Sequence, residues 1–201
     1  MSINELKGPL RDINLDFIMN DPSFKIDISK RYNTKFRIFY PSRKLIRCVF
    51  RNGGVLTGSR ALRCYTLQGS PILNRKVTDW DFVVTLEQAF KICSEMDINE
   101  IPRINDVISV NNQRMWRHPE YSDSYRVGPV DVQLIIREEL PTFTEIRGIR
   151  ISDFGYSISH KVQLVNDLES KRNRTNYYDE YTKHIVDLNQ IIVKFNALSK
   201  H

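Results

Sequence analysis

The chain of 201 residues carries 30 Lys and Arg against 24 Asp and Glu, a formal net charge of +6, and 41% of its residues are hydrophobic. These values are typical of one globular domain and exclude a chain that is collagen-like or disordered throughout. No run reaches the roughly 18 apolar residues that span a bilayer, and the charged N-terminal residues lack the apolar stretch of a signal peptide. We therefore expect a cytoplasmic or nuclear protein with no membrane partner.

The three cysteines, Cys48, Cys64 and Cys93, form no C-x-x-C pair and have no histidine at ligand spacing. An odd number without such spacing indicates neither a disulfide framework nor a zinc site. We expect three buried thiols.

Positive charge is concentrated in one segment of the chain. Between Lys25 and Lys76 there are 13 basic residues against Asp27 alone, a net charge of +12, whereas the remainder of the chain is net acidic. Such a segment attracts phosphate, either in a nucleotide or in a nucleic-acid backbone. On charge alone, a solvated basic surface explains the segment equally well.

The first half of the chain predicts an irregular arm over residues 1–24 and no firm element over residues 26–40. Residues 45–50 indicate a short strand or the end of a helix, followed by a turn at 52–54. Residues 55–57 lead into Gly58-Ser59, which we place at a strand-to-helix junction with Ser59 in N-cap position before helix formers at 60–65.

Alternating apolar residues predict a half-buried strand over 77–85, with Trp80 and Phe82 on one face and Asp79 and Asp81 on the other. A helix is expected over 86–96, strands over 107–110 and 125–137, and helices over 157–171 and 176–198. The apolar stripes of the last two helices are typical of core packing. No repeat or linker interrupts the chain, so one domain with a helical tail is the simplest organisation.

Three features then suggest phosphate chemistry. Residues i and i+2 of a strand point to the same side, so Asp79 and Asp81 hold two carboxylates together, and Asp131 on a neighbouring strand completes a cluster. Clustered carboxylates need a cation, and Mg²⁺ prefers their hard oxygens while keeping positions for water or phosphate. Two such ions support in-line phosphoryl transfer. A solvated sheet face is the alternative explanation of the two acids.

The Gly58-Ser59 turn supplies the complementary feature. Backbone N–H groups at a helix start bind phosphate, and Gly58 allows a close approach because it has no side chain. Ser59 adds a hydroxyl group. An ordinary helix cap is the alternative explanation.

These residues resemble a known family. Leu56-Thr57-Gly58-Ser59-Arg60-Ala61-Leu62, then Thr78-Asp79-Trp80-Asp81-Phe82, then Val130-Asp131-Val132 are similar to the motifs of the DNA polymerase β-type nucleotidyltransferase superfamily. The turn is most similar to that of minimal predicted members reading G-S-R-A. Residues 181–188 are more loosely similar to a C-terminal helix that bears Lys and Asp.

The resemblance implies an α+β fold, a mixed sheet flanked by helices. Residues 1–150 would form the catalytic core with its N-terminal arm, and residues 151–201 a helical extension packed on it. Gly58 and Ser59 would hold the triphosphate of an NTP, Asp79 and Asp81 would bind two Mg²⁺ (or Mn²⁺) ions, and Asp131 would bind the catalytic one. Either Arg60 or Lys161 would neutralise the triphosphate, the alternative being exposed helix side chains. A long interval before Asp79 suggests an inserted loop with Arg75 and Lys76 beside the site.

The leading hypothesis is therefore an enzyme that transfers NMP from an NTP to a hydroxyl, with RNA or a tRNA end as the acceptor favoured by the basic segment. A protein acceptor remains open, and a cationic drug ranks last because it would need an acidic pocket. Two readings from other classes also remain: a nucleotide- or RNA-binding module without turnover, and a structural protein. Neither the NTP, the number of nucleotides added nor the oligomeric state is predicted.

Overall fold

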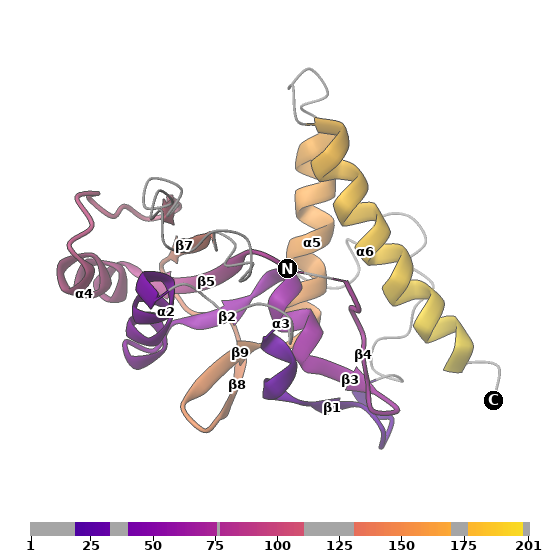
Figure 1. Ribbon diagram of the computed structural model, residues 1–201. Helices are drawn as coiled ribbons and strands as arrows, with labels where there is room; N and C mark the ends of the chain where they lie inside the picture. The colour runs from indigo at the N-terminus through magenta and orange to yellow at the C-terminus, as the bar shows by residue number, and fades with distance from the viewer. Residues whose placement is uncertain (1–18, 33–39, 76, 111–130, 170–176, 199–201) are drawn as a thin grey trace, which may run out of the picture.

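The computed structural model describes residues 19–32, 40–75, 77–110, 131–169 and 177–198, and the statements below concern these residues. They form an α+β fold in which a mixed sheet is flanked by helices (Figure 1), as predicted. None of the described helices is long and apolar enough to cross a membrane.

The main sheet has six strands in the order β6-β7-β5-β2-β9-β8. Their bounds are β2 Val55–Thr57, β5 Trp80–Thr85, β6 Val107–Val110, β7 Val132–Arg137, β8 Phe143–Ile146 and β9 Ile149–Ser152. The central strand β5 runs parallel to β7 and antiparallel to β2, with Asp81 paired to Gln133 on one side and to Thr57 on the other. This register decides which side chains of β7 lie beside the predicted acids.

Two groups of helices flank this sheet in Figure 1. Helices α2 (Tyr40–Arg51) and α4 (Leu86–Met96) pack together on one flank, and α5 (Phe154–Glu169) and α6 (Tyr177–Leu198) form a pair on the other. The short helix α3 (Gly58–Cys64) follows β2 directly and contacts α5. A small antiparallel sheet adds β1 (Lys25–Ile26), β3 (Tyr65–Leu67) and β4 (Ser70–Pro71), and η2 (Ile28–Arg31) packs on α3.

The predicted alternation of β5 is confirmed. Trp80 and Phe82 are fully buried and meet Phe50 of α2, with ring centroids of Phe50 and Phe82 5.1 Å apart. The opposite face of the strand presents Asp81 toward α5. One continuous apolar core includes residues of both C-terminal helices, such as Ile158 and Ile191. The three cysteines are free and buried, as predicted.

Of the two alternatives for residues 45–50, the structure shows the end of a helix, which begins at Tyr40 and in which the buried positions 45, 46 and 49 alternate with exposed basic ones. Other elements differ from the prediction. The β8–β9 hairpin and the small sheet were not predicted. Their strands are short and partly polar, and the hairpin turn rests on Arg147-Gly148, both with positive φ. The N-cap of α3 is Thr57 and not Ser59. Predictions for residues 1–18, 111–130 and 170–176 lie outside the described residues.

Candidate functional site

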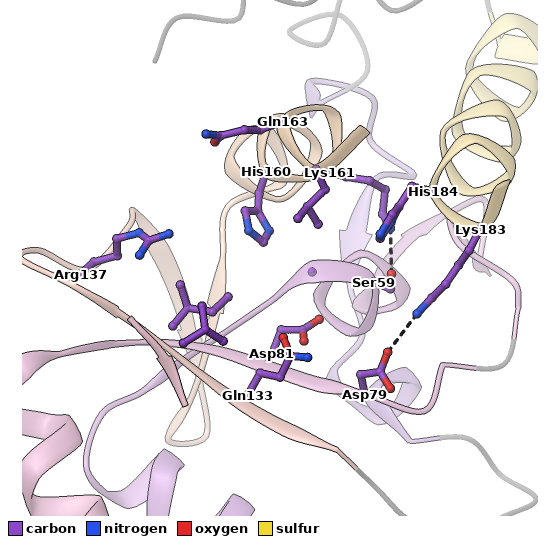
Figure 2. A pocket seen from close by; sticks show the side chains of 14 residues that line it. Ser59, Asp79, Asp81, Gln133, Arg137, His160, Lys161, Gln163, Lys183 and His184 are labelled. Carbon is purple, nitrogen blue, oxygen red and sulfur yellow. Dashed lines mark hydrogen bonds and ion pairs between the residues drawn. The ribbon is translucent and has the colours of Figure 1, made fainter. Parts of the chain in front are cut away.

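A pocket of about 370 Å³ lies between the sheet and the C-terminal helices. Its floor comes from β5, β6 and β7, and its other walls come from the start of α3 and from α5 and α6 (Figure 2). The lining residues are Gly58, Ser59, Asp79, Asp81, Val107, Gln133, Ile135, Arg137, His160, Lys161, Gln163, Leu164, Lys183 and His184. Five of the seven residues predicted for the site are among them: Gly58, Ser59, Asp79, Asp81 and Lys161.

Gly58 is the point at which the turn meets the acid pair. Its φ is +66°, and a Cβ atom placed on it would lie 2.3 Å from Oδ2 of Asp81. Only glycine combines that backbone conformation with so close an approach. The carboxylate of Asp81 therefore packs directly against the backbone of the turn, which joins two motifs that are 23 positions apart in the sequence.

Both oxygens of Asp79 have partners. Its Oδ1 accepts a hydrogen bond from Thr78 Oγ1 at 2.7 Å, and its Oδ2 accepts one from Lys183 Nζ at 3.0 Å (Figure 2 shows the latter). Burial acts to raise the pKa of Asp79, but Lys183 and Thr78 outweigh it and hold that pKa below its ordinary value. Asp79 is therefore ionised near neutral pH.

Asp81 behaves in the opposite way. Burial, followed by the negative charge of Asp79, raises the pKa of Asp81 to about 6, against the pull of Lys161 and Lys183. Two carboxylates on the same side of a strand thus repel one another in a poorly hydrated place. The pair is an arrangement that an added cation stabilises.

Beside the acids, Lys161 lies in a buried network that sequence reasoning did not foresee. Lys161 is 2% exposed, and its Nζ donates to Asp187 Oδ2 at 2.6 Å, to Ser59 Oγ at 2.9 Å and to His184 Nδ1 at 3.3 Å. Arg75 completes the network by donating to both carboxylate oxygens of Asp187 and to Ser59 Oγ. The network ties α3, the segment before β5, α5 and α6 together around the pocket.

The protonation states in this network follow from burial and charge. Burial acts to raise the pKa of Asp187, but Arg75 and Lys161 lower it by more than burial raises it, so Asp187 is ionised. Burial lowers the pKa of Lys161, an effect that Asp187 opposes. Burial and then the charge of Lys161 lower the pKa of His184 to about 4, so His184 is neutral at pH 7. Because an ammonium group only donates, Nδ1 of His184 is the acceptor and its proton is on Nε2.

Asp131 lies beside Asp79 but outside the wall of the pocket. Its carbonyl accepts from Trp80 N at 2.7 Å, which continues the β5–β7 register and sets Asp131 opposite Asp79. The residue opposite Asp81 is Gln133, an amide. Within the described residues, no three His, Cys, Asp or Glu side chains form a group that could hold a metal ion. The expected three-acid cluster is thus assembled only as a pair.

The charge of Asp79 nevertheless acts on the side chain of Asp131. Burial and the negative charge of Asp79 raise its pKa, against Lys183. Its Oδ1 is buried and accepts no hydrogen bond from the described residues.

Arg60 does not line the pocket, in contrast to the expectation that it binds nucleotide. It is 3% exposed and donates to the carbonyls of Asp79 and Val77 at 2.8 and 2.7 Å, and its guanidinium lies 4.2 Å from the ring centroid of Trp80. Its role is to hold the segment before β5 in place. Neither Arg60 nor Lys161 is the exposed helix side chain of the alternative explanation.

Sequence reasoning assigned no site role to three polar residues that shape the site: Lys183, His184 and Asp187. The only signal for them was the loose similarity of residues 181–188 to a Lys- and Asp-bearing helix. The expectation that Arg75 lies beside the site is confirmed by its hydrogen bond to Ser59. Lys76 lies outside the described residues.

No protein-family model matches this sequence, and no curated protein matches it. Among solved structures, the chain is similar to the crystal structure of JHP933 from Helicobacter pylori, with 16% sequence identity over 80% of this chain and 81% of that chain. The TM-score is 0.32, too low for conclusions about the fold or function of this chain.

Proposed function

We propose that the protein is a Mg²⁺-dependent nucleotidyltransferase that transfers NMP from an NTP to a hydroxyl group and releases pyrophosphate. The observation that carries the proposal is the contact between Gly58 and Asp81, which places a carboxylate pair against a glycine turn inside one pocket. The pocket also contains Lys161 and Lys183, and Lys183 Nζ lies 3.0 Å from Asp79 Oδ2. Negative groups for a metal and positive groups for a triphosphate thus face the same space.

The residues present fit the proposed metal. Asp79 and Asp81 offer hard oxygen ligands, and Mg²⁺ commonly binds through one or two carboxylates plus substrate phosphates. Burial and then the negative charge of Asp79 raise the pKa of Asp81, and a bound cation would offset both effects. Oδ1 of Asp131, which is buried and has no hydrogen-bond partner among the described residues, is a further oxygen next to Asp79. When bound, Mg²⁺ or Mn²⁺ supplies charge neutralisation of the phosphates and activation of the attacking hydroxyl.

The remaining residues orient the nucleotide. Lys183 is partly exposed in the pocket, and His184 has its Nε2–H as a neutral donor. Lys161 contributes a fixed positive field, because its three protons are all donated to protein partners. Ser59 is held by Lys161 and Arg75 at the start of α3.

RNA is the proposed acceptor, although the structure divides the basic segment. Arg60 and Arg63 donate hydrogen bonds to backbone carbonyls, and Arg75 donates to the carboxylate of Asp187. Four exposed cations of the segment lie on α2, on the side of the sheet away from the pocket: Arg43, Lys44, Arg47 and Arg51. The proposal is that an RNA backbone contacts α2 while its hydroxyl end enters the pocket.

A protein hydroxyl is the second candidate acceptor, and a specific observation favours it. A hollow of about 840 Å³ adjoins the pocket and shares Arg137, His160 and Gln163 with it. Its lining includes the carboxylates Glu138, Glu139 and Asp153, which repel a phosphate backbone but accept a neutral or cationic segment.

The competing class is a binding module of the same fold without turnover. It is favoured by the incomplete acid cluster and by the closed hydrogen-bond network of Lys161. Product formation separates the two classes, because only the enzyme converts the NTP.

The test is to incubate the purified protein with each α-labelled NTP, Mg²⁺ or Mn²⁺, and a mixture of cellular RNA and protein. An Asp79→Asn/Asp81→Asn variant, checked for folding by circular dichroism, is the control. Label on RNA or on protein with the wild type only supports the transferase and names its acceptor. Nucleotide binding without any labelled product contradicts the enzyme and favours the binding module.

A further inference from the structure

The ion pair between Lys183 and Asp79 occupies the oxygen that a metal ion needs. Nζ of Lys183 lies 3.0 Å from Oδ2 of Asp79, and Thr78 holds the other oxygen. A divalent cation and the ammonium group therefore compete for the same carboxylate. Asp79 and Asp81 line the same pocket beside this ion pair, and two neighbouring carboxylates repel one another unless a cation neutralises them.

The Lys183 side chain can rotate while the backbone of helix α6 stays in place. One turn further along, Asp187 is fully buried and held by Lys161 and Arg75, which anchors the backbone of α6 at the pocket. The Lys183 side chain is 39% exposed, and its four-carbon stem has many rotamers. Release of Asp79 therefore needs only rotation of one side chain.

The other lysine of the pocket is unsuited to this exchange. Nζ of Lys161 donates to Ser59, Asp187 and His184, which uses all three of its protons. Moving it would leave the buried Asp187 short of a partner, which is costly. Lys183 is thus the cation that can leave at low cost.

We propose that Lys183 is an exchangeable counter-ion: it neutralises Asp79 until a divalent cation arrives with the nucleotide, and its ammonium group then turns to the phosphates in the pocket. This inference rests on the proposed function. It makes Lys183 a positioning residue that weakens metal binding in the absence of NTP and strengthens NTP binding. The pocket consequently takes up metal and nucleotide together.

The experiment measures Mn²⁺ binding to the full chain by electron paramagnetic resonance, with and without NTP. A positive charge beside a carboxylate lowers its affinity for a proton by about 1–3 pKa units, and the same repulsion opposes the binding of Mn²⁺. Without NTP, Lys183→Met is therefore expected to bind Mn²⁺ at least about tenfold more tightly than the wild type. Lys183→Arg keeps the charge and should stay near the wild-type affinity. Lys91→Met is the matched control, since Lys91 pairs with Glu87 at 2.7 Å on the remote helix α4.

The possible results distinguish failure of the counter-ion role of Lys183 from failure of the proposed metal-dependent function. Equal or weaker Mn²⁺ binding by Lys183→Met, with wild-type binding intact, overturns the counter-ion role alone. Absence of Mn²⁺ binding in every variant, with and without NTP, overturns the metal-dependent function as well. Tighter Mn²⁺ binding by Lys183→Met, together with weaker NTP binding and no change in Lys91→Met, supports the exchange.

Discussion

Replacing Gly58 with alanine tests the contact on which the site depends. The added Cβ would lie 2.3 Å from Oδ2 of Asp81, more than 1 Å inside ordinary contact at 3.4 Å, and 3.2 Å from its Cγ. The positive φ of +66° adds roughly 1–2 kcal/mol for a residue with a Cβ. For a chain of this size that corresponds to a fall in Tm of about 2–8 °C. Displacement of the Asp81 carboxylate by about 1 Å is expected to slow nucleotidyl transfer about 100-fold.

Gly69→Ala is the matched control. Gly69 has a φ of +75° but no atom within 4 Å of its Cβ position, so it carries the same backbone penalty without the contact. Differential scanning calorimetry and the labelled-NTP assay on both variants separate strain from displacement. We expect similar losses of Tm but loss of metal binding and transfer in Gly58→Ala only. Wild-type metal affinity in Gly58→Ala would refute the reasoning.

Four further outcomes are expected. Asp187→Asn leaves the buried Lys161 without its counter-ion and should cost about 3–5 kcal/mol in denaturant unfolding, whereas a loss below about 1 kcal/mol would contradict the network. Because burial raises the pKa of Asp81 to about 6, the folded protein loses the stabilising protonated form of this carboxyl as pH rises from about 4 through about 6. The stability of Asp81→Asn relative to the wild type should therefore increase over that window, by at most about 3 kcal/mol. A stability difference that does not change with pH would argue against burial of the charge. Asp131→Asn should abolish product formation, and surviving product would count heavily against a two-metal mechanism. Mg²⁺ at 100 times its Kd should stabilise the wild type by about 2.7 kcal/mol in thermal melts but leave Asp79→Asn/Asp81→Asn unchanged, and no shift in either would favour a structural protein.

Local spacing explains what the sequence determined by itself. The alternation around Trp80 and Phe82 placed Asp79 and Asp81 on one face of a strand, because successive side chains of a strand point to opposite sides. The role of Gly58 was also predicted from local sequence, since a glycine between an apolar run and helix formers marks a strand-to-helix junction that needs a residue without a side chain. Helices α4, α5 and α6 were also visible as apolar periodicities.

Only the tertiary structure decided the partners of these residues. Arg60 and Lys161 were similar helix cations in the sequence, but Arg60 is turned onto backbone carbonyls and Trp80, whereas Lys161 reaches the pocket. Strand register set Gln133, not Asp131, opposite Asp81. Lys183 meets Asp79 across 104 positions of sequence. Covalent geometry fixes which neighbours share a face, but contacts between distant segments depend on how whole elements pack, and no local pattern records that.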